Sequence, residues 1–325
     1  MIEATQLVRR FVVKKSRQFR SVVQEEITAV DGVNLNIERG EIVALLGMNG
    51  AGKTTTIKML STLLKPTSGT IAMDGIDVVS QPSLARPLIN MVAGGEKMLY
   101  WRLTGKENLV YFARLYGYGG HEAAQRAIKL LGMVGLSEAA DLAVERYSKG
   151  MKQRLQVARG LINDPRYLFL DEPTLGLDAP IAREIRNLVR ELAREHNRGI
   201  LLTSHYMAEV EELSDRIYLL HRGRIIQQGK PEQLRVLSGE QVKYNLTLSG
   251  VNAANLDNCF RDLGVNGLKV TQAEGTTHVE FNAPQEFPQE HIFRAVTALD
   301  ADIVDFRTLE PSLEDVVVAL VGETA

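Results

Sequence analysis

The stretch Gly47-Met48-Asn49-Gly50-Ala51-Gly52-Lys53-Thr54, GMNGAGKT in one-letter code, decides the fold of this 325-residue chain. It matches the pattern G-x-x-x-x-G-K-S/T, with an apolar segment, EIVALL, before it and a helical run, TTIKMLSTLL, after it. Glycines let consecutive backbone N–H groups turn towards phosphates, and the start of a helix adds positive potential. The stretch, extended by Thr55, therefore predicts a phosphate-binding P-loop.

Two side chains of this loop carry its expected chemistry. Lys53 can reach the β- and γ-phosphates of a nucleotide, and the Thr54 hydroxyl can ligate Mg²⁺. A glycine-rich turn with a chance lysine would share the same letters. The apolar strand before it and the helix after it favour the nucleotide site.

Polar residues end two other apolar segments. Asp171 and Glu172 follow YLFL, where Asp171 can hold the water shell of Mg²⁺ and Glu172 can deprotonate the attacking water. His205 follows ILLTS, and the carboxyl ends of parallel strands are where α/β proteins bind ligands, so it can reach the γ-phosphate. The alternatives are a solvent-facing acidic pair and a structural histidine.

Composition narrows the class of protein. The formal charge of −2 gives no reason to expect nucleic acid as a partner, and Cys259, the single cysteine, excludes an intrachain disulfide. No apolar run approaches the roughly 18 residues that span a bilayer, and the N-terminus lacks the apolar core of a signal peptide. We expect a protein kept inside the cell, which needs a membrane partner if it works at a membrane.

The chain divides into two patterns. From Glu41 to Gly229 short apolar runs alternate with helical patterns, which predicts an α/β domain with a largely parallel sheet. The clearest strands are Ile42–Leu46, Tyr167–Leu170, Ile200–Thr203 and Arg216–Leu220. The helical section from Gly105 to Asn163 is too long for one crossover, so we expect an inserted helical subdomain over about residues 96–163.

The second pattern follows residue 239. Strand and helix signals alternate there as βαββαβ, from VKYNLTL to IVDFRT, which resembles a small ferredoxin-like α+β domain. We therefore expect an ATP-binding domain over residues 1–238 and an accessory domain over residues 239–325.

The segment YSKGM, residues 147–151, looks like the start of a helix with unusual chemistry. Ser148 is a good N-cap and Gly150 leaves the backbone bare, so this helix end could bind an anion. It lies in the helical insert, where we expect the P-loop of the same chain not to reach. The simplest explanation is a site that faces the ATP of a second copy.

YSKGMKQRL resembles the signature of the ABC ATPases, and the other motifs follow in that family's order. The resemblance implies a RecA-like P-loop core, ATP and Mg²⁺ as cofactors, and a dimer with itself or a paralogous subunit. It also implies a membrane permease as partner and a place at the cytoplasmic face of the cell membrane. The residues that it implies are Ser148, Lys149, Gly150 and Met151 for the partner's ATP, Asp178 for the dimer contact, Glu172 and His205 for catalysis, and Phe11 for adenine. The tail resembles ATPases of the daunorubicin-resistance exporters, but the substrate is not readable from this chain.

One position departs from the family's pattern. Gly94-Gly95 stands where a glutamine that contacts Mg²⁺ is expected, and Glu96 is the nearest polar candidate for that role. A solvated loop glutamate is the alternative. The basic segment from Lys14 to Arg20 also has two interpretations, a contact with the membrane surface or permease and a solvated β-hairpin.

Other functions have less support from the sequence. A soluble ABC ATPase acting on DNA or ribosomes typically has long coiled coils or tandem ATPase domains, and the sequence shows no such pattern. A GTPase switch needs the base-reading motif N-K-x-D, which is absent from the sequence. A regulator that binds nucleotide without hydrolysis would be expected to lose Glu172 or His205, and both are present.

Overall fold

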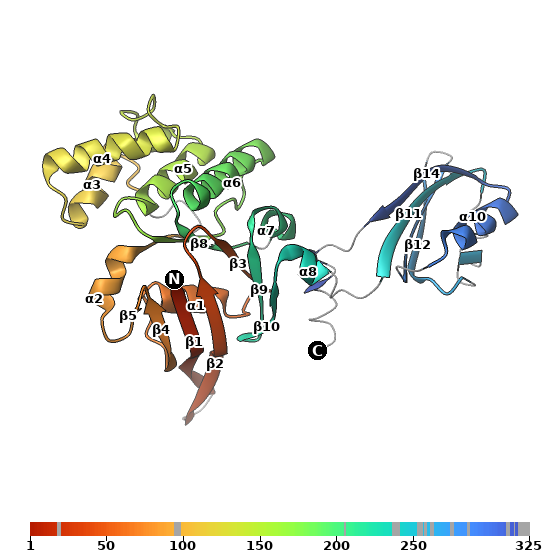
Figure 1. Cartoon of the computed structure of the whole chain (residues 1–325), viewed down its shortest axis with the longest axis horizontal. Helices are drawn as coiled ribbons and strands as arrows, with labels where there is room; N and C mark the ends of the chain where they lie inside the picture. Colours follow the sequence, from red (N-terminus) through yellow and green to blue (C-terminus); the bar gives the residue numbers. More distant parts are fainter. Residues whose placement is uncertain are drawn as a thin grey trace. The chain divides into compact units, whose positions relative to one another are not determined.

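The computed structural model describes residues 1–17, 21–93, 99–204, 206–235, 241–251, 256, 259–260, 263–273, 276–284, 287–309, 313–314 and 316–317. Two compact units, Met1–Lys230 and Pro231–Ala325, make up the chain (Figure 1). The expected domain boundary, between residues 238 and 239, lies outside the described residues. Across the described residues, no helix is long and apolar enough to cross a membrane.

In the described part of the first unit, six strands form the central sheet in the order β10-β9-β3-β8-β7-β6. They are β3 (Ile42–Leu46), β6 (Ile89–Val92), β7 (Tyr167–Asp171), β8 (Gly199–Thr203), β9 (Arg216–His221) and β10 (Arg224–Gly229). Neighbouring strands are parallel except for β10, which pairs antiparallel with β9. The predicted α/β core and its four clearest strands are confirmed.

Both faces of this sheet are covered, which explains why its strands are continuous apolar runs. Val43 and Leu45 pack in one cluster with Ile57 of the P-loop helix α1 (Lys53–Leu60) and with the N-terminal strands. Ile42, which points to the other face, packs with the inserted helices and α6 (Ala179–Arg194). Successive strand residues point to opposite faces, so one strand anchors both layers.

The inserted section is helical, as predicted. Its helices are α3 (Gly105–Leu115), α4 (Gly120–Met133) and α5 (Lys149–Gly160). A capping box starts α3, because the Thr104 side chain accepts from the Glu107 amide and the Glu107 side chain accepts from the Thr104 amide. The other helices of this unit include α2 (Pro82–Ala85) and α7 (Met207–Leu213).

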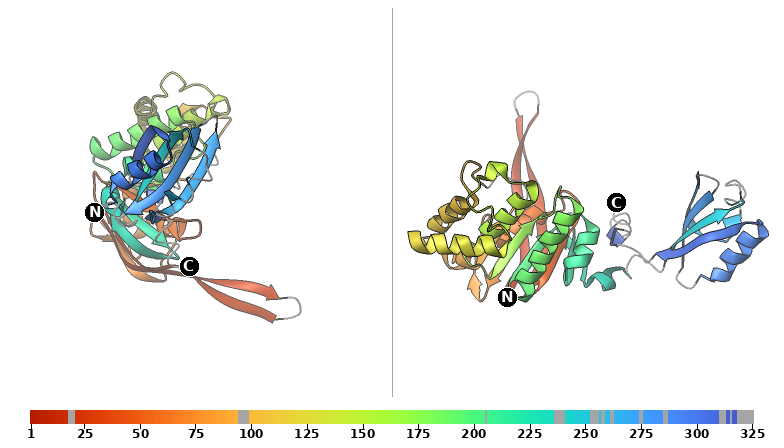
Figure 2. Two further views of the ribbon diagram at one scale, coloured as in Figure 1. Left: turned by 90° about the vertical axis from the view of Figure 1, so that its right-hand side faces the viewer. Right: turned by 90° about the horizontal axis from the view of Figure 1, so that it is seen from above.

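An antiparallel sheet forms from the N-terminal strands, and it contains the β-hairpin that was one of the two interpretations of the basic segment. Its order is β2-β1-β4-β5, with β1 (Ile2–Arg17), β2 (Ser21–Ile37), β4 (Ser68–Met73) and β5 (Ile76–Asp77). β1 pairs with β2 as far as Arg17↔Ser21, but with β4 only to Val8↔Ser68. The outer part of the hairpin is therefore a two-stranded ribbon that projects from the unit (Figure 2).

The second unit contains the short helix α8 (Pro231–Arg235) and an antiparallel sheet in the order β12-β13-β11-β14. The strands are β11 (Gln241–Ser249), β12 (Asn266–Ala273), β13 (Thr276–Pro284) and β14 (Asp302–Leu309), and α10 (Gln289–Ala298) precedes β14. Tyr244 stacks on Phe281 at 5.1 Å between ring centroids, in a core that includes Ile292 of α10. The four strands and the second helix predicted for this region are confirmed.

Candidate functional site

The register of the central sheet brings the two main nucleotide motifs to one edge. Thr203, the last residue of β8, lies opposite Leu45 of β3 on one side and Asp171 of β7 on the other. The P-loop begins two residues after Leu45, at Gly47. The loop and the Asp171-Glu172 pair therefore leave the sheet at the same end, on either side of Thr203.

Two glycines of the P-loop are required by its backbone path. A Cβ at Gly47 would lie 2.3 Å from the Leu220 carbonyl oxygen, and a Cβ at Gly52 would lie 2.6 Å from that of Ala29. Gly52 also has a positive φ of 109° and is the N-cap of α1, with no side-chain cap bond in this described segment. The first N–H groups of α1 are thus available to an anion such as phosphate.

Lys53 lies between the loop and the carboxylates. Its Nζ donates to the carbonyl oxygens of Gly47 at 2.6 Å and Met48 at 3.0 Å. Burial lowers the pKa of Lys53, while the negative charges of Glu172 and Asp171 act in the opposite direction. The structure therefore brings together these three charged residues of the predicted site, next to exposed Thr54.

The two carboxylate residues are held by Thr203. Its Oγ1 donates to Asp171 Oδ1 at 2.5 Å, and its carbonyl oxygen accepts from the Glu172 amide at 3.0 Å. Glu172 has a φ of +51°, in the left-handed region that non-glycine residues rarely adopt. Such strain persists only where surrounding contacts hold it, and it concentrates at functional sites.

Glu209 is a residue of this region that the sequence did not single out. It is only 4% exposed, and its carboxylate accepts from Thr174 Oγ1 at 2.7 Å and from Ser204 Oγ at 2.6 Å. It therefore joins the loop after Glu172 to the end of β8. The available signal was its helical spacing from Leu213, which places a carboxylate on the buried face of α7.

The signature stretch starts α5 as predicted. Ser148 is the N-cap, and its Oγ accepts from the Met151 amide at 3.2 Å. Asp178 is likewise the N-cap of α6, accepting from the Ile181 amide at 3.1 Å. A Cβ at Gly150 would lie 2.6 Å from Ile181 Cγ2, so this glycine is also required for the packing of α5 on α6.

The remaining predicted site residues are only partly placed. Phe11 lies in β1 opposite Ile27, and the Arg9 guanidinium is 4.7 Å from its ring centroid. His205 and Glu96 lie outside the described residues. Among the described residues, no group of three or more His, Cys, Asp or Glu could hold a metal ion by itself.

The fold and this edge of the sheet define a P-loop nucleotide-binding protein. The sequence profile of the ABC transporter family matches residues 30–175. The chain is 42% identical to the ABC transporter ATP-binding protein NatA of Bacillus subtilis, over 72% of this chain and 91% of NatA. It is 37% identical to the daunorubicin/doxorubicin resistance ATP-binding protein DrrA of Streptomyces peucetius, over 91% of this chain and 89% of DrrA.

Solved structures agree with these relatives. A dimeric ATP-binding cassette, MJ0796, in a post-hydrolysis state bound to ADP and Pi, is 28% identical with a TM-score of 0.61. That match covers 71% of this chain and 98% of the cassette. The chain belongs to the ABC transporter family, as an ATP-binding subunit that hydrolyses ATP.

Proposed function

We propose that this chain powers the export of a drug-like or antibiotic-like molecule, by hydrolysing ATP in a head-to-tail dimer attached to a membrane permease. The convergence of Lys53, Asp171 and Glu172 carries the proposal for the catalytic site. The resistance named for the 37% identical relative supports export. Transport by membrane vesicles containing this chain and its permease should require ATP and stop with Lys53→Ala; transport that continues would contradict the proposal.

The catalytic residues act at the edge of the sheet. When ATP binds, the Lys53 ammonium group leaves the carbonyl oxygens of the loop and contacts the β- and γ-phosphates instead. Glu172 orients the attacking water and accepts its proton, and His205 contacts the γ-phosphate. Phe11 stacks on adenine.

Mg²⁺ fits the donors present in this chain. Thr54 and Asp171 supply oxygen ligands, directly or through water, which suits an ion that keeps several waters and binds substrate phosphates. When bound, the ion neutralises charge on the β- and γ-phosphates. We retain Glu96 as a candidate third contact, replacing the glutamine expected at Gly94-Gly95.

The dimer is supported by the start of α5. Its N-cap geometry leaves backbone N–H groups of Lys149 and Gly150 for the γ-phosphate of a second subunit. The dimeric cassette that resembles this chain supports the same assembly. We propose that Ser148 and Met151 complete the signature and that Asp178 contacts the second subunit.

A cavity of about 520 Å³ supports a docking site for the permease. Its described lining includes three cations, Lys58, Arg86 and Arg159, and no carboxylate. Arg159 is 8% exposed, and within the described part of the chain its Nε and Nη2 have no hydrogen-bond partner. Burial lowers the pKa of Arg159, and nearby Tyr116 opposes that shift.

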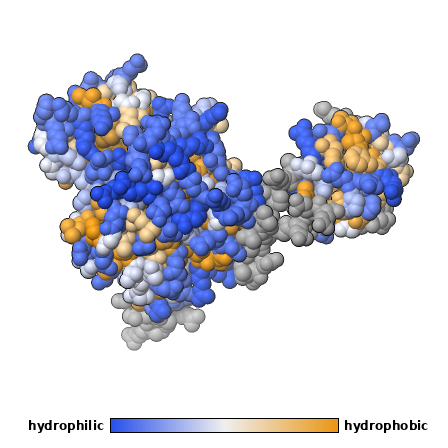
Figure 3. Space-filling view, viewed as in Figure 1, coloured by the Kyte–Doolittle hydropathy of each residue, from blue (hydrophilic) through white to orange (hydrophobic). Residues whose placement is uncertain are grey.

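Exposed apolar side chains lie beside these cations. Tyr116 of its lining is 47% exposed, and Leu63 is 69% exposed. The space-filling view shows apolar side chains gathered near α2, where Leu84 is 56% exposed (Figure 3). The Arg159 guanidinium also lies 5.3 Å from the Phe112 ring centroid. An apolar permease segment that carries an acidic side chain would match the apolar surface and supply a partner for Nε and Nη2 of Arg159.

Arg159→Met should weaken assembly with the permease. Removing one partner of a buried ion pair costs about 2 kcal/mol or more, which is roughly a 30-fold loss of affinity. Co-purification with the permease measures it, and thermal unfolding checks that the variant is folded. Arg114→Met, an exposed position on α3, is the control. Equal permease binding by both variants would contradict the proposed docking site.

The projecting hairpin supports a position against the membrane. Residues 9–26 contain six cations, Arg9, Arg10, Lys14, Lys15, Arg17 and Arg20, against two acids, Glu25 and Glu26, and Arg10 pairs with Glu26 at 3.9 Å. A two-stranded ribbon is marginally stable alone, so a surface beneath it would stabilise it. Anionic headgroups attract clustered cations by about 1 kcal/mol per residue. We propose that the ribbon places this subunit at the cytoplasmic face of the membrane.

Charge reversal on the ribbon tests that position. Lys14→Glu with Arg17→Glu should reduce co-sedimentation with phosphatidylglycerol vesicles by more than about tenfold, because four units of charge change. High salt should remove the remaining binding. Lys269→Glu with Arg307→Glu makes the same change in the second unit and is the control. If the ribbon variant keeps both vesicle binding and permease assembly, the solvated-hairpin interpretation is correct.

The second unit supports a ferredoxin-like assignment. Its strands, numbered within the unit, lie in the order 2-3-1-4, each pair antiparallel, with α10 between the third and fourth. This is the arrangement expected of a βαββαβ unit. We propose residues 1–238 as the ATP-binding domain, with the helical subdomain at about 96–163, and residues 239–325 as the accessory domain.

A further inference from the structure

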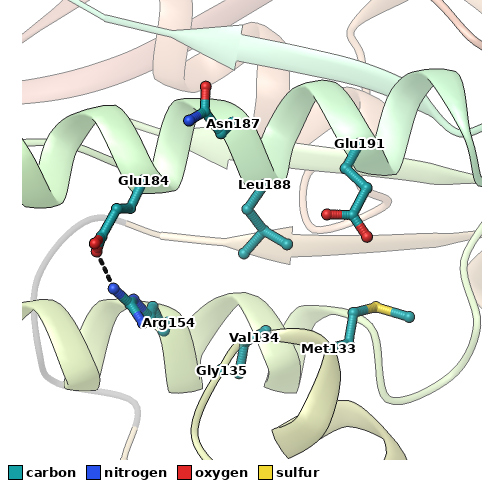
Figure 4. A pocket seen from close by; sticks show the side chains of 8 residues that line it. All are labelled: Met133, Val134, Gly135, Arg154, Glu184, Asn187, Leu188 and Glu191. Carbon is teal, nitrogen blue, oxygen red and sulfur yellow. Dashed lines mark hydrogen bonds and ion pairs between the residues drawn. The ribbon is translucent and has the colours of Figure 1, made fainter.

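Two contacts join α5 to α6, and a third joins α5 to the loop that precedes α6. Gly150 packs against Ile181, as described above. Further along the helices, Arg154 of α5 forms an ion pair with Glu184 of α6 (Figure 4). The third contact differs, because Lys149 Nζ donates at 2.5 Å to the carbonyl oxygen of Gly176, in the loop before α6.

The backbone of Gly176 leaves space for the Lys149 ammonium group. Its φ is +68°, and a Cβ there would lie 2.4 Å from Lys149 Nζ. Any side chain at this position would therefore displace the ammonium group. Glycine suits this carbonyl for two reasons, the backbone conformation and the space that the lysine fills.

The position of Lys149 is costly without such a partner. It is the first residue of α5, where the positive end of the helix dipole disfavours a cation. A carbonyl oxygen next to the ammonium group offsets that cost. The contact with Gly176 thus accounts for a lysine at an otherwise unfavourable place.

Gly176 belongs to the segment that carries the proposed base. This segment runs from Glu172 to Asp178, and the Leu175 amide donates to the Glu172 carbonyl oxygen at 3.2 Å. The strained backbone of Glu172 depends on such contacts. A shift of α5 would therefore displace the segment that begins at Glu172, because Lys149 connects the two.

We infer that Lys149 is a positioning residue that couples the signature of each subunit to the Glu172 segment of the same subunit. This inference rests on the proposed head-to-tail dimer, in which the signature faces the partner's ATP while Glu172 serves its own. ATP binding at the partner's site, which contacts the signature, would then change the position of Glu172 at this subunit's own site through Lys149. The expected consequence is cooperative hydrolysis.

Lys149→Met tests the coupling. We expect kcat to fall about 3- to 10-fold, as for loss of one hydrogen bond to a charged group, and the Hill coefficient for ATP to fall towards 1. ATP binding to the monomer should not change. Lys149→Arg, which can still reach a carbonyl oxygen, should keep most of the cooperativity.

Two further variants separate coupling from general packing. Arg154→Met removes the ion pair between α5 and α6 and should leave the Hill coefficient unchanged. Gly176→Ala should reproduce the Lys149→Met effect, and the double variant should be no worse than Gly176→Ala alone. Additive losses, or a Lys149→Met enzyme with unchanged kcat and Hill coefficient, would overturn the inference.

The wild-type protein distinguishes this failure from failure of the proposed function. If it neither dimerises with ATP nor hydrolyses ATP, the proposed function fails and the inference with it. If it dimerises and hydrolyses ATP without cooperativity, only the coupling through Lys149 is overturned.

Discussion

Glu172→Gln is expected to bind ATP normally and to hydrolyse it about 10²–10⁴-fold more slowly than the wild-type protein. The amide has the shape of the carboxylate but cannot accept a proton from water. The backbone contact of residue 172 with Thr203 is independent of the side chain, so the site should remain assembled. Because the ATP is not consumed, the variant should accumulate as an ATP-bound dimer.

Single-turnover hydrolysis and size-exclusion chromatography with ATP measure these two effects. Lys53→Ala is the matched control, since it should weaken ATP binding itself and give no dimer. Near-normal turnover by Glu172→Gln would remove Glu172 from the role of base.

Backbone strain at Glu172 provides an independent check. Glycine adopts a φ of +51° without penalty, so Glu172→Gly should relieve strain of about 1 kcal/mol while losing the base. We expect the variant to be inactive and slightly more resistant to heat. Strain of this kind at the proposed base would be typical of a site selected for activity rather than stability.

The edge of the sheet that carries the candidate site was predictable because its sequence signals are local. An apolar strand, a glycine-rich turn and a helix place Lys53 within one segment, and YLFLDE ends a strand at two carboxylates. Parallel strands in one sheet then bring Asp171 and the P-loop to the same edge. No tertiary contact was needed to predict this part of the fold.

The rest depends on contacts between distant residues. The role of Glu209 follows from Thr174 and Ser204, which only the packing of α7 brings to it. The N-terminal sheet depends on pairing β1 with β4 across more than sixty residues, as in Ile2↔Met73. The contact between Gly150 and Ile181 likewise joins two helices, so the sequence alone suggested only a phosphate-related reason for this glycine.

Gly150→Asp is expected to abolish the ATP-driven dimer while the monomer still binds ATP. In the proposed dimer, an aspartate at this position places a negative charge next to the partner's γ-phosphate. The new Cβ also meets Ile181 Cγ2 at 2.6 Å, so a packing defect alone could disturb the dimer. Ile181→Ala makes room for the new Cβ, so double variants that carry it separate the effect of the charge from the effect of the packing defect.

Gly150→Ala with Ile181→Ala adds the Cβ without charge and should still dimerise with ATP. Gly150→Asp with Ile181→Ala should not. Light scattering with and without ATP, in the Glu172→Gln background to prevent turnover, measures the difference. If the alanine pair also fails to dimerise, packing rather than charge explains the loss.

A mixed dimer then decides whether the signature acts across the interface. One subunit carries Lys53→Ala, and the other carries Gly150→Asp with Ile181→Ala. If the signature completes the partner's site, one site holds both lesions and the other holds none, so ATP should occupy one site per dimer. If the signature served its own chain, each site would hold one lesion, and occupancy would fall at both. Counting bound nucleotide per dimer separates these outcomes, because the intact site keeps wild-type affinity only when the signature and the P-loop come from different subunits.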